Sequence, residues 1–176
     1  MSTIDNQQKT YKKNLTYVDF RTAAYRNLHV CQELYSRSLT SESRYKKQIF
    51  HKVYYLSGYI IEFCFKYSLF SNEKISQNQN LYEYENEDFR RKWKQHDFNK
   101  LRQLCEDRNI LFSSDIPYFG SKVQDKKIEK LIKAWDVQIR YSLSLSNQHL
   151  NLLESEIKNL IDFIEIVLNK ITSKYS

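Results

Sequence analysis

Apolar residues recur every three or four positions along most of this chain, which is the spacing that places them on one face of an α-helix. The C-terminal segment shows this most clearly, because its aliphatic residues alternate the two spacings throughout. They are Leu150, Leu153, Ile157, Leu160, Ile164, Val167 and Ile171. A seam of this regularity is suited either to the core of a helical bundle or to a partner helix.

The N-terminal part of the chain predicts two long helices. In the first, the apolar positions that follow one helical face are Tyr17, Phe20, Ala24, Leu28, Cys31 and Tyr35. The second is expected to begin at an N-cap of Thr40 or Ser41, with the acidic Glu42 in its first turn, and to run to about Phe70. Its apolar residues cover more than one face, as is typical of a helix in the middle of a bundle.

Two residues of this second helix require an explanation. Gly58 costs about 1 kcal/mol relative to alanine in a helix interior, and therefore predicts close packing by a neighbouring helix. Glu62 lies in the most apolar stretch of the chain, where an unpaired carboxylate would be costly. Lys66 follows one turn later and can pair with it. Glu62 is therefore either part of a structural ion pair or hydrogen bond between helices, or a polar group that serves a functional site.

The remaining segments alternate between polar connections and shorter helices. Residues 71–94 are polar and rich in Asn, Gln and Glu, and we expect them to be poorly ordered or functional. A short helix is predicted over 98–104. The segment 112–121 contains the single proline and one of the two glycines, and is predicted to be a loop. Another helix is predicted over 128–139, weakening through the serine-rich residues 142–146.

Composition supports an all-α fold, because 2 glycines and 1 proline among 176 residues leave few turns for a sheet. We predict a single-domain bundle of about five helices over residues 15–176, preceded by a disordered polar segment at residues 1–14. That segment lacks the apolar region of a signal peptide. The longest apolar run, Val53–Phe65, is too short to cross a bilayer and contains Glu62. We therefore expect a cytoplasmic protein with no membrane partner.

Charge, cysteine content and the absence of known motifs bear on the expected partners, compartment and cofactors. The net charge of +7 favours anionic partners such as nucleic acid or acidic proteins. Cys31, Cys64 and Cys105 are widely spaced among apolar residues, which predicts buried free thiols in a reducing compartment. The 4 histidines lie far apart, and no glycine-rich phosphate loop, nucleophile elbow or zinc-protease motif occurs. Neither a metal nor another cofactor is expected.

Several cationic residues are candidates for binding an anion. A basic, aromatic run before the short helix contains Phe89, Arg90, Arg91, Lys92, Trp93 and Lys94. Such a run either holds phosphates by charge and bases by stacking, or forms a solvated basic face anchored by one tryptophan. Arg44 and His51 are two turns apart on one face of the second predicted helix, which they share with Tyr55 and Glu62 further along. Arg140 stands at a helix end, where an arginine can also simply bind the last carbonyl groups.

Three segments together suggest a family. The first is Tyr54–Lys66, with the pattern aromatic–Gly–apolar–Glu–Phe–Cys–Phe–Lys; the second is His96–Leu101, with a His–Asp start; the third is Trp135–Tyr141, which ends in Arg–Tyr. They resemble, in the same order, the central helix, the H-D-L-x-x-L segment and the W-x-x-x-x-R-Y helix end of the HEPN family of small helical domains. The resemblance covers most of residues 50–142.

The resemblance implies a dimerising helical bundle of the kind found in bacterial toxin–antitoxin, nucleotidyltransferase-linked and anti-phage systems. Many members of that family are metal-independent endoribonucleases in which an arginine and a histidine, separated by four to six residues, meet their counterparts at the dimer interface. In such chemistry the ribose 2′-hydroxyl attacks the phosphate, the histidine transfers protons, and the arginine stabilises the pentavalent phosphate.

The position of the arginine–histidine pair remains open in this chain. The resemblance implies Arg140, but the next histidine, His149, comes nine residues later, on the opposite face of a continuous helix. A break within residues 142–146 would bring the two together. The pairs that have the family's spacing are Arg44–His51, Arg90–His96 and Arg91–His96.

The leading hypothesis is a homodimer that binds or cleaves RNA in a bacterial defence or toxin–antitoxin system. Its catalytic cluster would consist of Arg140, Tyr141, His96 and Glu62. In this cluster Arg140 holds phosphate, His96 transfers protons or donates a hydrogen bond, and Glu62 orients one of them. The nucleic-acid-binding residues would be Arg90, Arg91, Lys92 and Lys94.

The alternative hypothesis is a non-catalytic helical adaptor. It would bind a partner protein, such as an antitoxin, a nucleotidyltransferase or another defence component, through the apolar seam of the last helix. The same polar cluster would then be an internal network that stabilises the bundle.

Overall fold

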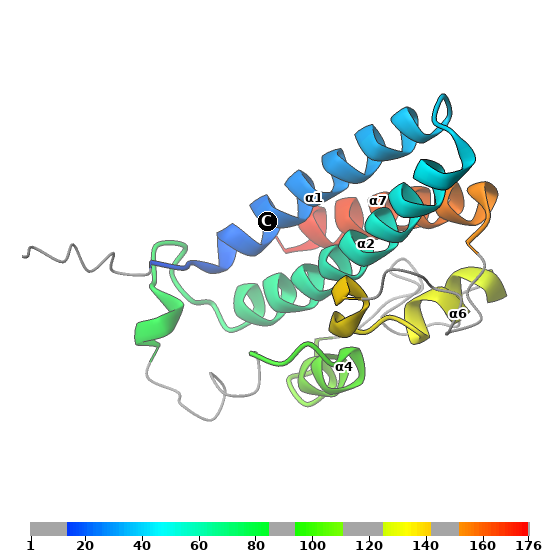
Figure 1. Ribbon diagram of the computed structural model, residues 1–176. Coiled ribbons are helices and arrows are strands. Elements are labelled where there is room, and N and C mark those ends of the chain that lie inside the picture. Colours follow the sequence, from blue (N-terminus) through cyan, green and yellow to red (C-terminus); the bar gives the residue numbers. More distant parts are fainter. Residues whose placement is uncertain (1–13, 85–93, 111–124, 142–151, 176) are drawn as a thin grey trace, which may run out of the picture.

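The computed structural model describes residues 14–84, 94–110, 125–141 and 152–175. Within these ranges the chain forms five packed α-helices and two 3-10 helices, without a β-strand (Figure 1). The elements are α1 (Tyr17–Ser38), α2 (Ser43–Asn72), η1 (Leu81–Glu83), α4 (Phe98–Glu106), α6 (Lys126–Lys133), η2 (Val137–Tyr141) and α7 (Glu154–Lys174). The predicted all-α fold with about five helices is confirmed.

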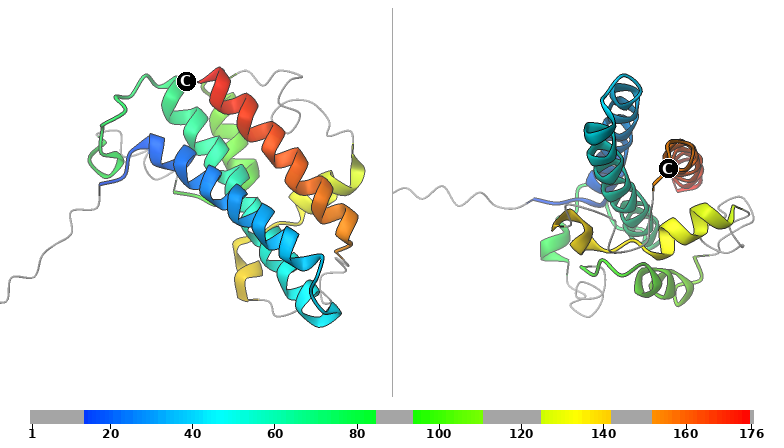
Figure 2. Two further views of the ribbon diagram at one scale, coloured as in Figure 1. Left: turned by 90° about the horizontal axis from the view of Figure 1, so that it is seen from above. Right: turned by 45° about the vertical axis from the view of Figure 1, so that its right-hand side comes forward.

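Helix α2 is the centre of the bundle. It forms an antiparallel hairpin with α1 and also contacts α7, α4 and η2. Figure 1 shows α1 on one side of α2 and α4 with α6 on the other, and Figure 2 shows α7 alongside the two long helices. From Ile60 to Phe70 every residue except Phe63 is buried, as expected of a helix with apolar residues on most faces.

The turn between α1 and α2 differs from its prediction. The N-cap of α2 is Glu42, not Thr40 or Ser41, and the first turn of the helix contains no acidic residue. The reason lies in α1, whose C-terminal carbonyl groups need donors. The hydroxyl groups of Ser41 and Thr40 both donate to the carbonyl oxygen of Arg37, at 2.8 and 3.3 Å. They therefore complete the first helix instead of starting the second.

The predicted continuous helix over 128–139 is wrong, because α6 ends at Lys133 and η2 begins only at Val137. Two side chains explain the break. The indole Nε1 of Trp135 donates to the carbonyl oxygen of Tyr55 on α2, at 3.1 Å, and so holds this point of the chain against the central helix. The carboxylate of Asp136 accepts from the backbone N–H of Gln138 at 2.7 Å, which starts a new helical turn.

The apolar seam of α7 faces the core. Its residues Ile157, Leu160, Ile164, Val167 and Ile171 are 0–1% exposed, and the helix contacts α1, α2 and α6. Leu153 is the N-cap residue of α7 and is 49% exposed, while Leu150 lies outside the described residues. Of the two predicted uses of the seam, the structure therefore shows the bundle core.

The polar stretch 71–94 is described over residues 71–84 and at Lys94, and the part that ends at residue 84 packs against the start of α1. Leu81 is fully buried, and its backbone N–H donates to the carbonyl oxygen of Leu15 at 2.7 Å. The Asn80 side chain accepts from the N–H of Leu15 at 3.3 Å and from that of Tyr82 at 3.2 Å. Residues 1–13, 85–93, 111–124 and 142–151, on which several predictions fall, lie outside the described residues.

The cysteines agree with their prediction. Cys31, Cys64 and Cys105 are buried free thiols, and burial raises the pKa of each, that of Cys31 to about 12. Among the described helices, none is long and apolar enough to cross a membrane.

Candidate functional site

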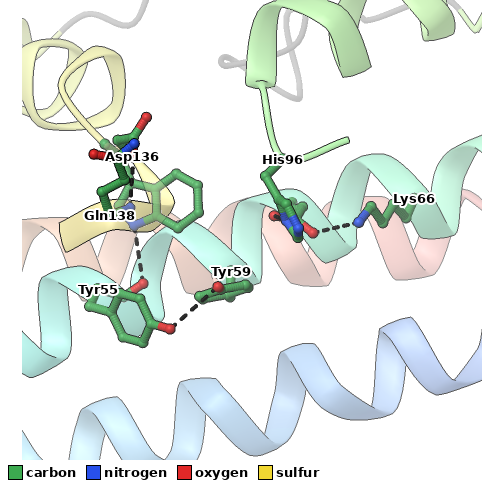
Figure 3. Close-up of polar contacts among 8 residues, drawn as sticks. Tyr55, Tyr59, Lys66, His96, Asp136 and Gln138 are labelled. Atoms are coloured by element: carbon green, nitrogen blue, oxygen red, sulfur yellow. Dashed lines mark hydrogen bonds and ion pairs between the residues drawn. The ribbon is translucent and has the colours of Figure 1, made fainter. Parts of the chain in front are cut away.

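The candidate site is centred on Glu62, in the middle of α2. Its side chain is only 1% exposed, and each of its two carboxylate oxygens has a cationic or hydrogen-bonding partner. Lys66, one turn later on α2, donates from Nζ to Oε1 at 2.5 Å, and His96 approaches Oε2 with Nδ1 at 2.8 Å (Figure 3). The predicted Glu62–Lys66 pair is confirmed, and the predicted meeting of Glu62 with His96 is confirmed as well.

The Glu62–Lys66 ion pair is buried, so separating the two charges would cost free energy. Lys66 is 4% exposed, so both partners of the ion pair have lost most of their water. The attraction between such charges offsets their desolvation only when the geometry is good, and removal of one partner leaves a buried charge without compensation. The Lys66 ammonium also lies 5.9 Å from the ring centroid of Phe20 on α1. Glu62 and Lys66 are therefore fixed to the central helix as one unit.

His96 is the solvent-facing member of the trio, with its side chain 50% exposed. It comes immediately before Asp97, which caps α4 by accepting from the backbone N–H groups of Asn99 and Lys100. Because an ionised carboxylate can only accept hydrogen bonds, Nδ1 of His96 is the nitrogen that carries the proton toward Glu62. Nε2 then remains as the nitrogen that can accept or release a proton, which is the arrangement of a carboxylate-oriented general base.

Aromatic rings surround the exposed histidine. The ring of Tyr59 meets His96 edge-on at a centroid distance of 6.3 Å and meets Trp135 edge-on at 5.4 Å. Trp135 in turn stacks on Phe98 of α4 at 4.8 Å, with the two planes 4° apart. These contacts hold the start of α4 and the segment before η2 beside the same two turns of α2, and so fix the position of His96.

Gly58 makes this close approach feasible. A Cβ atom at this position would lie 1.9 Å from Cε2 of Trp135, so no larger residue fits without moving the indole. The prediction that a neighbour packs closely on Gly58 is confirmed, although the neighbour is the side chain of Trp135 in the connection between α6 and η2 and not another helix.

The other predicted catalytic residues, Arg140 and Tyr141, belong to η2, which contacts α2. Their side chains lie outside the described part of the structure, as does His149. Arg90, Arg91 and Lys92 also lie outside it. Lys94 is exposed, and its ammonium is 5.8 Å from the ring centroid of Tyr82.

The pair Arg44–His51 is separate from this site. Both residues belong to the N-terminal part of α2, and His51 is eleven positions before Glu62, about 16 Å along the helix axis. Its Nε2 is buried and has no hydrogen-bond partner among the described residues. Burial, followed by the charge of Lys52, lowers the pKa of His51. The spacing of Arg44 and His51 therefore does not bring them to the Glu62 trio.

Sequence reasoning placed Tyr55 on the helix face of Glu62 but missed its pairing with Tyr59. Tyr55 and Tyr59 are one turn apart on α2, and the hydroxyl of Tyr55 donates to that of Tyr59 at 3.3 Å. Their spacing of four residues was a visible signal, but many pairs of tyrosines in this chain have helical spacing. Among the described residues, no three His, Cys, Asp or Glu side chains are grouped so as to hold a metal ion.

The comparisons with known proteins give no match: no family model, no curated protein and no solved structure is similar to this chain.

Proposed function

We propose that this protein acts on RNA as an HEPN-like domain of a bacterial defence or toxin–antitoxin system, and that it cleaves RNA without a metal ion. The observation that carries the proposal is the half-exposed imidazole of His96, held through Nδ1 by the buried carboxylate of Glu62. A histidine oriented in this way, with one nitrogen directed away from the carboxylate, is equipped for proton transfer to or from a substrate.

The mutual contacts of the three segments that resemble the HEPN family support the proposal. The first segment meets the second through Glu62 and His96, 2.8 Å apart. It meets the third through Gly58 and the indole of Trp135. The second and third meet through the stacked rings of Phe98 and Trp135. Segments that share one site in space are better candidates for a common function than segments that share only an order in the sequence.

Each component has a role in the proposed reaction. Nε2 of His96 removes the proton of the ribose 2′-hydroxyl, whose oxygen then attacks the adjoining phosphate and displaces the 5′-oxygen of the next nucleotide. Glu62 holds the imidazole in the required tautomer and orientation. Arg140 stabilises the charge of the pentavalent phosphate, and Tyr141 contributes a hydrogen bond. Arg90, Arg91, Lys92 and Lys94 hold the strand, and a second copy of the chain completes the site as a homodimer.

The test is cleavage of total RNA by the purified protein in EDTA, with His96→Gln and Arg140→Ala beside the matched surface variants His29→Gln and Arg26→Ala. His29 and Arg26 are exposed residues of α1. We expect cleavage to persist in EDTA and to fall by about 10²–10⁴ in His96→Gln, with a large loss in Arg140→Ala and none in the α1 variants. Equal activity in His96→Gln and His29→Gln would refute the proposal.

A second function is favoured by the completeness of the trio within the fold. Both oxygens of Glu62 are already occupied by Lys66 and His96, as in a network whose purpose is to fix α4 on α2. The protein would then be a non-catalytic adaptor in the reducing cytoplasm. Because the α7 seam is buried, such an adaptor would bind its partner through another surface. Absence of cleavage, with His96→Gln affecting only stability, would favour this function.

A further inference from the structure

Two tyrosine rings lead along α2 toward His96. Tyr55 and Tyr59 are both half-buried, and their rings meet edge-on at a centroid distance of 5.1 Å. Tyr59 meets His96 at 6.3 Å. In Figure 3 the three side chains follow one another along α2, with Tyr55 farthest from the imidazole. The surface beside the histidine is therefore aromatic over two turns of helix.

A cation accompanies the outer ring. Lys52 precedes Tyr55 by three residues on α2 and is exposed, and its ammonium lies 4.9 Å from the ring centroid of Tyr55. A similar combination occurs where Lys94 lies 5.8 Å from the ring centroid of Tyr82 in η1. An exposed ammonium beside an aromatic ring offers the two groups that a nucleotide needs, a charge for its phosphate and a flat apolar face for its base.

The two combinations lie on opposite sides of the histidine. Tyr55 precedes Glu62 by seven residues, which is about 10 Å along the helix axis. On the other side, Tyr84, at the end of the segment 80–84 that contains Tyr82, packs its ring against Phe70. Phe70 follows Glu62 by eight residues, which is about 12 Å along the helix axis in the opposite direction. His96, bonded to Glu62, lies between them. The Lys52–Tyr55 combination therefore lies about 10 Å along the helix axis from the level of Glu62 and its partner His96, a spacing that an extended strand can span.

We propose that Lys52 and Tyr55 form a base-stacking subsite for single-stranded RNA, beside the phosphate on which His96 acts. The inference rests on the proposed function and names its substrate class. A base must be unpaired to lay its face on the half-buried ring of Tyr55, because the faces of paired bases are covered by their neighbours in the helix. Lys52 moves from the ring to the phosphate of the stacked nucleotide, and Tyr59 keeps the Tyr55 ring in position through the edge-on contact between the two rings.

The test is binding of a short fluorescein-labelled oligouridine by anisotropy, in the background His96→Gln so that the RNA stays intact. We expect Tyr55→Leu to weaken binding about tenfold, the effect of losing one stacked base, and Tyr55→Phe to bind as the parent does. Lys52→Gln should reduce the slope of log Kd against log salt concentration by about one. This surface variant changes no buried contact, so it tests the subsite even if Tyr55→Leu is poorly folded.

An oligouridine with one abasic residue identifies the stacked position. At that position, loss of the base and Tyr55→Leu should not add, since both remove the same contact. Unchanged binding by Tyr55→Leu and Lys52→Gln, in a protein whose wild type cleaves RNA, would overturn the subsite and leave the proposed function standing. Failure of the wild type to bind or cleave any RNA would overturn the proposed function and the subsite together. If Tyr55→Leu weakened the binding of duplex RNA as much as that of the oligouridine, this would also contradict the inference.

Discussion

Helices α1 and α7 pack with α2 through long, regular apolar seams, whereas the shorter α4–η2 side combines buried apolar residues such as Leu101 and Leu104 with specific aromatic and polar contacts. On the first side the residues that matter are interchangeable aliphatic and aromatic side chains at helical spacing, such as Ile164 and Leu28, both at most 5% exposed. On the second side three contacts each depend on a particular residue: the indole of Trp135, the absence of a side chain at Gly58, and the carboxylate of Glu62.

The two sides differ in the kinds of side chain that they bring together. A regular seam tolerates exchange of one apolar residue for another of similar volume and carries no chemistry. The α4–η2 side brings a charge, an imidazole and several rings to one surface, and it does so through segments that are short and come from distant parts of the sequence. The apolar seams of α1 and α7 hold α2 in place, and the charged, imidazole and aromatic side chains of the α4–η2 side are positioned on it.

The largest expected effect comes from breaking the buried charge pair. Glu62→Ala removes the carboxylate that pairs with the ammonium of Lys66, which is 4% exposed, and should lower the free energy of unfolding by about 3–5 kcal/mol in urea titrations. The double variant Glu62→Leu/Lys66→Met removes both charges and should unfold at nearly the wild-type urea concentration. If the single variant is as stable as the double one, the buried ion pair is not required for stability, and Glu62 would be as replaceable as a residue of the apolar seams.

The next effect concerns the contact that only glycine permits. Alanine normally favours a helix over glycine by about 1 kcal/mol, yet Gly58→Ala should destabilise the protein by about 1–3 kcal/mol, because the new Cβ would displace the Trp135 indole. Gln48→Ala, at an exposed position of the same helix, should leave the urea midpoint unchanged. A stabilised Gly58→Ala protein would mean that the Trp135 indole can move without cost. The packing on this side of α2 would then not depend on glycine at position 58.

Thiol labelling can compare the local stability of the two sides. All three thiols are buried, and burial raises their pKa values, so none should react with a disulfide reagent at pH 8 until the chain opens locally. Cys105 on α4 should be labelled about tenfold faster than Cys31 or Cys64, because α4 is attached by fewer contacts. Peptide mapping by mass spectrometry assigns the label. Equal rates at the three sites would indicate that the bundle opens as one unit.

The smallest effect is a pH dependence on the α1–α2 side. The pKa of His51 is lowered, chiefly by burial and then by Lys52, so the unfolded chain binds its proton at a pH where the folded chain does not. Stability should therefore be complete above the usual pKa of 6.5 and decline as the pH falls below it. The urea midpoint of wild type, relative to that of His51→Gln, should therefore be lower at pH 5.5 than at pH 7.5. An identical difference at both pH values would contradict this origin.

Part of the candidate site could be predicted from the sequence. A glutamate in an apolar stretch must find a partner, and Lys66 one turn later is the nearest one, so this pair follows from local spacing. The contact with His96 was expected only through the order of the three motifs, because thirty-four residues separate it from Glu62. The roles of Arg140 and Tyr141 remain predictions. The contact between Tyr55 and Tyr59 was missed, since helical spacing alone does not distinguish a surface ring from a core ring.

By itself, the sequence determined the helical class, the long helices α1, α2 and α7 and the burial of their apolar faces, because period and composition act through neighbouring residues. Only the tertiary structure decided where the segment after α6 breaks, what fills the space over Gly58, and which group is the second partner of Glu62. Each of these depends on a side chain from a distant segment, and Trp135 and His96 reach α2 only once the helices have packed. Local pattern fixes the elements, while the meeting of single residues across them fixes the site.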